Sequence, residues 1–79
     1  MTDEELLARI GTAFTRVFGR QLRFDAGLSR AHEPRWTSLK HVEFIIALES
    51  EFAVRFDGAD ATDMTSIEVV LERIRTRLS

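Results

Sequence analysis

The sequence contains no cysteine, a single proline and no long apolar run. Without cysteine it has no disulfide framework, no thiolate zinc site and no cysteine nucleophile. No stretch approaches the roughly 18–20 apolar residues that a membrane span requires. The acidic start, Met1-Thr2-Asp3-Glu4-Glu5, is unlike a signal or transit peptide. We therefore expect a cytoplasmic protein.

A strong excess of one charge is also missing, because the formal net charge is only −2. Residues 1–40 carry seven basic and five acidic side chains, whereas residues 41–79 carry four basic and eight acidic ones. The acidic second half repels nucleic acid and anionic membranes and favours a partner with a basic patch. The arginines of the first half are scattered, so we expect neither nucleic-acid nor membrane binding.

The 79 residues are enough for one domain, 1–79, and 44% of them are hydrophobic, which favours an ordered core. Thr2 and Glu5 have the spacing of a capping box, and Gly19 supplies a stop, so we predict a helix over 3–18. Its apolar residues recur at helical spacing. They are Leu6, Leu7, Ile10, Ala13, Phe14, Val17 and Phe18.

Residues 19–36 have no helical period and are interrupted by Gly19, Gly27, Ser29 and Pro34. The stretch is longer than a usual connection of about 4–6 residues. Four large apolar side chains are spaced irregularly along it: Leu22, Phe24, Leu28 and Trp36. We predict a long loop anchored to the core by these four residues, with room for one short turn of helix.

A second helix is predicted from Thr37 or Ser38 to about Phe52, and it has two apolar faces. The predicted core face comprises Phe44, Ile45, Leu48 and Phe52. The other face comprises Leu39, Val42 and Ile46, flanked by Glu43, Glu49 and Ser50. An exposed apolar patch with a charged rim is typical of a binding surface. Alternatively, the three residues pack beneath the loop or another helix.

The rest of the chain predicts an extended stretch over 53–56, a turn at Asp57-Gly58 and a short helix within 59–64. A capping box from Thr65 to Glu68 opens the last helix. One face of that helix is apolar and carries Ile67, Val70, Leu71, Ile74 and Leu78. The expected fold class is all-α: a small four-helix bundle of three main helices and one short helix, with a long first loop.

Catalytic and metal-binding residues are not evident. Ser38 and His41 are three residues apart and could meet on one helix face, but no third group or cleft is indicated. Asp57, Asp60 and Asp63 lack the glycine and the final glutamate of a calcium loop, and we interpret them as solvated charges. We therefore predict neither a catalytic residue nor a metal site.

The hydroxyl pair Thr37-Ser38 allows two interpretations. If Thr37 is the N-cap, Ser38 is the first helical residue and its hydroxyl points outward. A phosphodiester on that oxygen would lie against the positive end of the helix. Alternatively, Ser38 is itself an ordinary N-cap. The residues alone leave both interpretations open.

Residues 36–52, WTSLKHVEFIIALESEF, resemble the signature of the acyl carrier protein family. In that family an Asp-Ser-Leu triplet opens the second helix, followed by a Val-Glu-hydrophobic run, Ala-Leu-Glu and a closing Glu-Phe. The resemblance extends to the first helix, the long loop and the Thr65-Ser66-Ile67 opening of the last helix. Thr37 stands where the family usually has aspartate, and Lys40 stands where an acidic or small residue is common.

The resemblance implies that Ser38 carries 4′-phosphopantetheine, transferred from coenzyme A by a phosphopantetheinyl transferase, and that acyl groups are held as thioesters on its thiol. It implies a monomer that docks acyl-loading, condensing or acyl-transfer enzymes in a specialised polyketide, lipid or aminoacyl-thioester pathway. The implied docking residues are Leu39, Val42, Glu43, Ile46 and Glu49. The alternative is a helical interaction module that has the carrier fold but is not phosphopantetheinylated.

Overall fold

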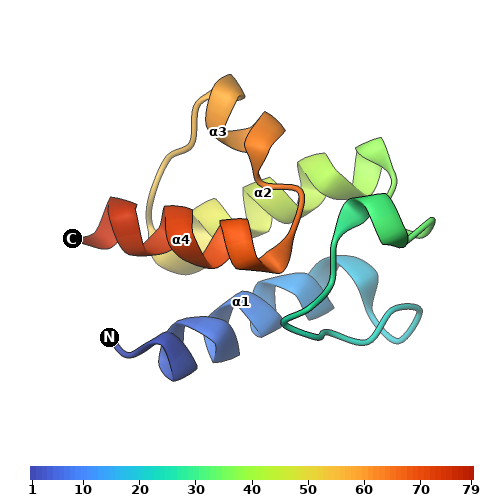
Figure 1. The fold of residues 1–79 in the computed structure, drawn as a ribbon, viewed down its shortest axis with the longest axis horizontal. Helices are drawn as coiled ribbons and strands as arrows, with labels where there is room; N and C mark the ends of the chain where they lie inside the picture. Colours follow the sequence, from blue (N-terminus) through green and yellow to red (C-terminus); the bar gives the residue numbers. More distant parts are fainter.

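The computed structural model describes all residues, 1–79, and consists of four α-helices and one 3₁₀ turn (Figure 1). In chain order they are α1 (Asp3–Phe18), η1 (Arg30–His32), α2 (Ser38–Phe52), α3 (Gly58–Asp63) and α4 (Ile67–Leu78). α1 packs against both α2 and α4. The predicted all-α fold, with three main helices, one short helix and a long first loop, is confirmed. None of the helices combines the length and apolar character that a membrane crossing needs.

The local signals of α1 act as predicted. Thr2 Oγ1 accepts a hydrogen bond from the Glu5 amide, and the Glu5 carboxylate accepts one from the Thr2 amide, which completes the capping box. Gly19 ends the helix with a positive φ of 57°, which glycine adopts more readily than other residues. Its amide donates to the Thr15 carbonyl. These caps satisfy backbone groups that a helix end otherwise leaves unpaired.

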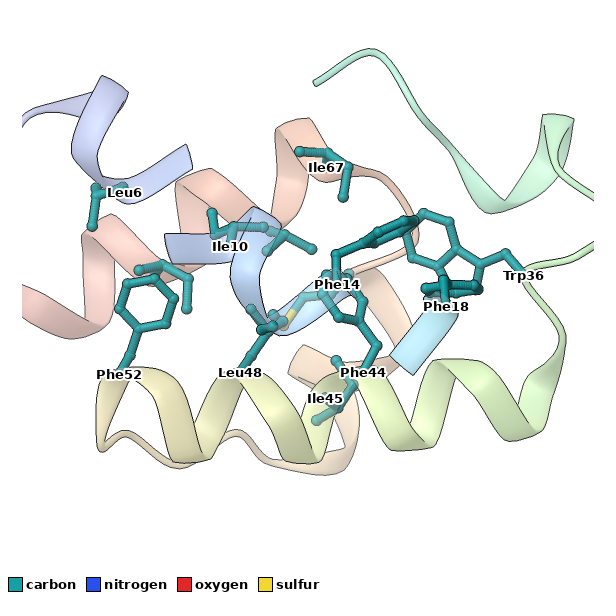
Figure 2. Close-up of a cluster of buried hydrophobic side chains, with 14 of the residues drawn as sticks. Leu6, Ile10, Phe14, Phe18, Trp36, Phe44, Ile45, Leu48, Phe52 and Ile67 are labelled. Atoms are coloured by element: carbon teal, nitrogen blue, oxygen red, sulfur yellow. The ribbon is translucent and has the colours of Figure 1, made fainter. Parts of the chain in front are cut away.

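Aromatic side chains form the centre of the core (Figure 2). Phe14 and Phe18 from α1 meet Phe44 from α2, with Phe14 and Phe44 in an edge-to-face contact at 5.4 Å between ring centroids. Trp36, from the loop, inserts its indole against all three rings at 5.7–6.1 Å. Such geometries add to the free energy gained by burial alone. The residue before the Thr37-Ser38 pair is therefore fixed in the core.

The long loop is anchored as predicted. Leu22 and Trp36 are buried, and Phe24 and Leu28 are half-buried against the core. The predicted short turn of helix is η1. The loop also pairs with the start of α4: the Arg30 amide donates to the Thr65 carbonyl at 2.8 Å, and the Ile67 amide donates to the Leu28 carbonyl at 3.0 Å.

That pairing corrects the predicted start of the last helix. The N-cap of α4 is Ser66, whose hydroxyl accepts from the Val69 amide at 3.2 Å, and no capping box from Thr65 to Glu68 forms. The Thr65 carbonyl is bound by the loop instead, which places Thr65 outside the helix. α3 also starts one residue earlier than predicted, because Asp57 is its N-cap and forms a capping box with Asp60.

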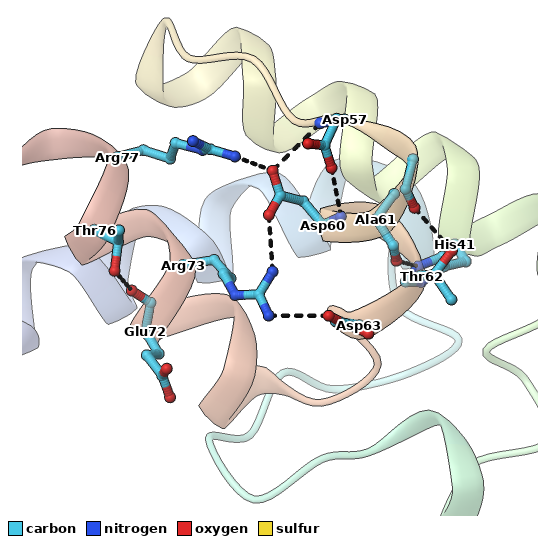
Figure 3. Close-up of polar contacts among 11 residues, drawn as sticks. His41, Asp57, Asp60, Ala61, Thr62, Asp63, Glu72, Arg73, Thr76 and Arg77 are labelled. Atoms are coloured by element: carbon cyan, nitrogen blue, oxygen red, sulfur yellow. Dashed lines mark hydrogen bonds and ion pairs between the residues drawn. The ribbon is translucent and has the colours of Figure 1, made fainter.

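Asp60 corrects a second prediction, since it is not a solvated charge. It is only 8% exposed, and its carboxylate pairs with Arg73, at 2.8 Å, and with Arg77 (Figure 3). Burial raises the pKa of the Asp60 carboxyl, but the hydrogen bonds from Arg77, the Asp57 amide and Arg73 outweigh it and hold the pKa below its usual range. The cluster ties α3 to α4.

Acid should therefore weaken the fold through Asp60. Its folded-state pKa lies below its unfolded-state value, so the contribution is present above about pH 4 and is lost as the pH falls through the folded-state pKa. We expect Asp60→Asn to flatten the decline of the unfolding free energy below pH 4, measured by urea denaturation at a series of pH values. Asp63→Asn is the comparison variant: Asp63 also binds Arg73, at 3.0 Å, but its side chain is 58% exposed, so this substitution should change the pH profile less. An unchanged pH profile in Asp60→Asn would contradict this assignment.

Candidate functional site

The start of α2 decides between the two interpretations of the hydroxyl pair. Thr37 has an extended backbone, and its Oγ1 accepts a hydrogen bond from the Lys40 amide at 3.2 Å. Thr37 is therefore the N-cap, and Ser38 is the first helical residue. Ser38 is exposed to solvent. The interpretation of Ser38 as an ordinary N-cap does not hold in this structure.

The surroundings of Ser38 suit an anion. The amides of Ser38 and Leu39 have no intramolecular acceptor, as is usual for the first turn of a helix. Arg30 Nη2 donates to Ser38 Oγ at 2.7 Å, so the hydroxyl lies beside a guanidinium as well as at the positive helix end. A phosphate bonded to this oxygen would find positive charge and free N–H donors. The residues present therefore fit the phosphate group through which 4′-phosphopantetheine would be attached at Ser38.

His41 is occupied elsewhere and makes no pair with Ser38. It is 7% exposed, its Nδ1 accepts from Trp36 Nε1 at 3.0 Å, and its Nε2 donates to the Ala61 carbonyl at 2.6 Å. Both ring nitrogens are thus used in a chain that links the loop, α2 and α3. This structural role of His41 is not among the roles expected from the sequence. A signal was present, since His41 precedes Phe44 and Ile45 by three and four residues on the buried face.

The second apolar face of α2 is open to solvent. Leu39 is 69% exposed, Val42 56% and Ile46 59%, so none of them packs beneath the loop or another helix. The predicted core face of the same helix is buried throughout: Phe44, Ile45, Leu48 and Phe52. The exposed apolar face begins next to Ser38 and continues along two turns of the helix.

The charged residues around that face differ in how they are held. Glu43 is exposed and lies 3.8 Å from Lys40 Nζ. Lys40 Nζ also donates to the Val17 carbonyl at 3.1 Å, in the last turn of α1. The Lys40 ammonium therefore interacts favourably with the negative end of the α1 dipole as well as with Glu43. Glu49 is half-buried, and its carboxylate accepts from the Phe56 amide at 2.8 Å. Glu49 therefore already has a structural partner, whereas Glu43 faces solvent.

The structure has two surface hollows, and neither is at Ser38. The larger one, about 520 Å³, lies on α1 beside Phe24. No group of three histidine, aspartate or glutamate side chains is arranged to hold a metal ion. The start of α2 thus combines an exposed hydroxyl, a neighbouring guanidinium and an apolar face. No protein-family model matches the chain, and no curated protein matches it either.

Proposed function

We propose that the protein is an acyl carrier that holds acyl groups as thioesters on a 4′-phosphopantetheine arm attached to Ser38. The observation that carries this proposal is the position of Ser38, exposed as the first residue of α2, beside Arg30 and next to an exposed apolar face. The chain has no cysteine, so the arm would supply the thiol. The protein would work in the cytoplasm, in a specialised polyketide, lipid or aminoacyl-thioester pathway.

Attachment requires only a nucleophilic oxygen from this chain. Ser38 Oγ would attack the β-phosphorus of coenzyme A and form a new P–O bond. The pyrophosphate P–O bond would break and release 3′,5′-ADP, and the serine proton would pass to a base of the transferase. Because Thr37 accepts the Lys40 amide, the Ser38 hydroxyl is not needed to cap the helix and is available for this reaction.

The exposed apolar face would dock the transferase and the acyl-loading, condensing or acyl-transfer enzymes. Leu39, Val42 and Ile46 would provide its apolar contacts, and Glu43 would provide a charged rim. Glu49 would contribute less direct charge than the resemblance implies, since it already binds the Phe56 amide. Thr37 replaces the aspartate that is usual before the serine, so this position would contribute no carboxylate to the contact with the transferase.

Incubation with coenzyme A and a broad-specificity phosphopantetheinyl transferase, followed by intact-mass spectrometry, tests the proposal. We expect one phosphopantetheine adduct on the wild-type protein and none on Ser38→Ala. Ser50→Ala is the matched control, because Ser50 is also exposed on α2, and it should be modified as the wild type is. A different result would favour the alternative, a helical interaction module that is not phosphopantetheinylated. In that case the wild-type protein would stay unmodified, and Ser38→Ala would bind its partner as tightly as the wild type does.

A further inference from the structure

Arg30 is held by hydrogen bonds beside the candidate attachment oxygen. Its amide donates to the Thr65 carbonyl at 2.8 Å, and its own carbonyl accepts from the Glu33 amide at 3.2 Å. Its side chain is fixed as well: Nε donates to the Trp36 carbonyl at 3.2 Å, and Nη2 donates to Ser38 Oγ at 2.7 Å. Both the backbone and the guanidinium of Arg30 are therefore positioned by hydrogen bonds.

The charge of Arg30 is not neutralised within the molecule. Six other cationic side chains pair with carboxylates: Arg9, Arg16, Lys40, Arg73, Arg75 and Arg77. The remaining arginines make no ion pair: Arg20, Arg23, Arg30, Arg35 and Arg55. Among these five, only Arg30 is partly buried and bound through its side chain. It is thus a fixed cation without a counter-charge.

We propose that Arg30 is a positioning residue that binds the phosphodiester formed on Ser38, an inference that rests on the proposed function. A guanidinium has five N–H donors, and Arg30 uses only two of its groups on neutral oxygens. Once Ser38 Oγ is esterified, the non-bridging phosphate oxygens lie one bond beyond the phosphorus and are better acceptors than the hydroxyl was. Arg30 keeps its contact with the Trp36 carbonyl and directs Nη2 to the phosphate.

This arrangement would fix the base of the arm while its remainder stays mobile. The two free amides of α2, from Ser38 and Leu39, would supply further donors to the same anion. A lysine would supply charge without the planar group that lets arginine bind the Trp36 carbonyl and the phosphate through N–H donors in fixed directions. The orientation of the phosphate, and with it the direction in which the arm leaves α2, would therefore depend on Arg30.

The experiment compares unmodified and fully modified protein, with modification verified by intact mass. Modification should raise the melting temperature of the wild type by about 2–5 °C and that of Arg30→Gln by less than half as much. Arg30→Gln also loses the bond to the Trp36 carbonyl, but it loses this bond in both its unmodified and its modified form. That loss therefore cancels when the two melting temperatures of the variant are subtracted. Arg35→Gln is the matched control, since Arg35 is exposed and unpaired, and it should retain the full wild-type shift.

Nuclear magnetic resonance of the wild type gives a readout that needs no variant. On modification, the Arg30 Nε–H signal should move and that of Arg35 should not. Equal melting shifts in the wild type and Arg30→Gln, with an unmoved Arg30 signal, would overturn the assignment of Arg30 and leave the carrier function intact. Failure of the wild type to form any adduct would overturn both proposals.

Discussion

Trp36→Ala is expected to destabilise the fold by about 3–5 kcal/mol, the range for removing a buried large aromatic side chain. Trp36 is 2% exposed, contacts the rings of Phe14, Phe18 and Phe44, and donates to His41. A domain of this size has an unfolding free energy of roughly 4–12 kcal/mol at about 0.05–0.15 kcal/mol per residue. The substitution would therefore remove a large part of the total stability.

Urea denaturation followed by circular dichroism measures this loss without depending on tryptophan fluorescence. Trp36→Phe is the matched control, because it keeps a ring in the core but removes the indole N–H that His41 Nδ1 accepts. It should cost less than Trp36→Ala, about 1–3 kcal/mol for the unpaired nitrogen. A cost below about 1 kcal/mol for Trp36→Ala would show that the loop is not anchored through this side chain.

Ile46→Gln combined with Val42→Gln is expected to lower kcat/KM for modification by the transferase about 5–30-fold. The substitutions remove apolar contact area from the proposed docking face, and an interface contact of this kind contributes about 1–2 kcal/mol. Both residues are more than half exposed, so the unfolding free energy should change by no more than about 0.5 kcal/mol for each residue. Glutamine keeps good helix propensity, which limits other effects.

Leu78→Gln is the control for this pair, because Leu78 is also an exposed apolar residue but lies at the end of α4. Its modification rate should equal that of the wild type. A modification rate unchanged by the double substitution would exclude the Leu39–Ile46 face as the transferase contact. A stability loss of several kcal/mol would show instead that the face is covered by the protein itself.

The sequence was sufficient to predict α1 and α2 because their signals are local. The start of α1 is defined by Thr2 and Glu5, its end by Gly19, and the start of α2 by Thr37. Each of these residues acts within one turn of the helix end, and the apolar period defines the buried faces. The last helix was predicted one residue early at its N-cap. Thr65 and Ser66 are adjacent hydroxyl residues, and only the pairing of the loop with this segment selects Ser66.

The polar part of the site depends on contacts between segments and was not predicted. Arg30 precedes Ser38 by eight residues of irregular loop, so neither helical nor strand periodicity relates them. Their contact follows from the insertion of Trp36 into the core, which brings η1 to the start of α2. Arg73 and Arg77, four residues apart on α4, were a usable signal of a buried acidic partner such as Asp60.

The attachment of α3 gives the molecule uneven local stability. α3 itself adds only Ala61 to the packing of the apolar core, and polar groups hold it: His41 at the Ala61 carbonyl, and Arg73 and Arg77 at Asp60 (Figure 3). Water can replace such bonds at small net cost, whereas separation of α1 from α2 exposes the aromatic cluster. We therefore expect sub-global opening of residues 57–63 to require less free energy than global unfolding and to leave α2 packed against α1 through the aromatic cluster.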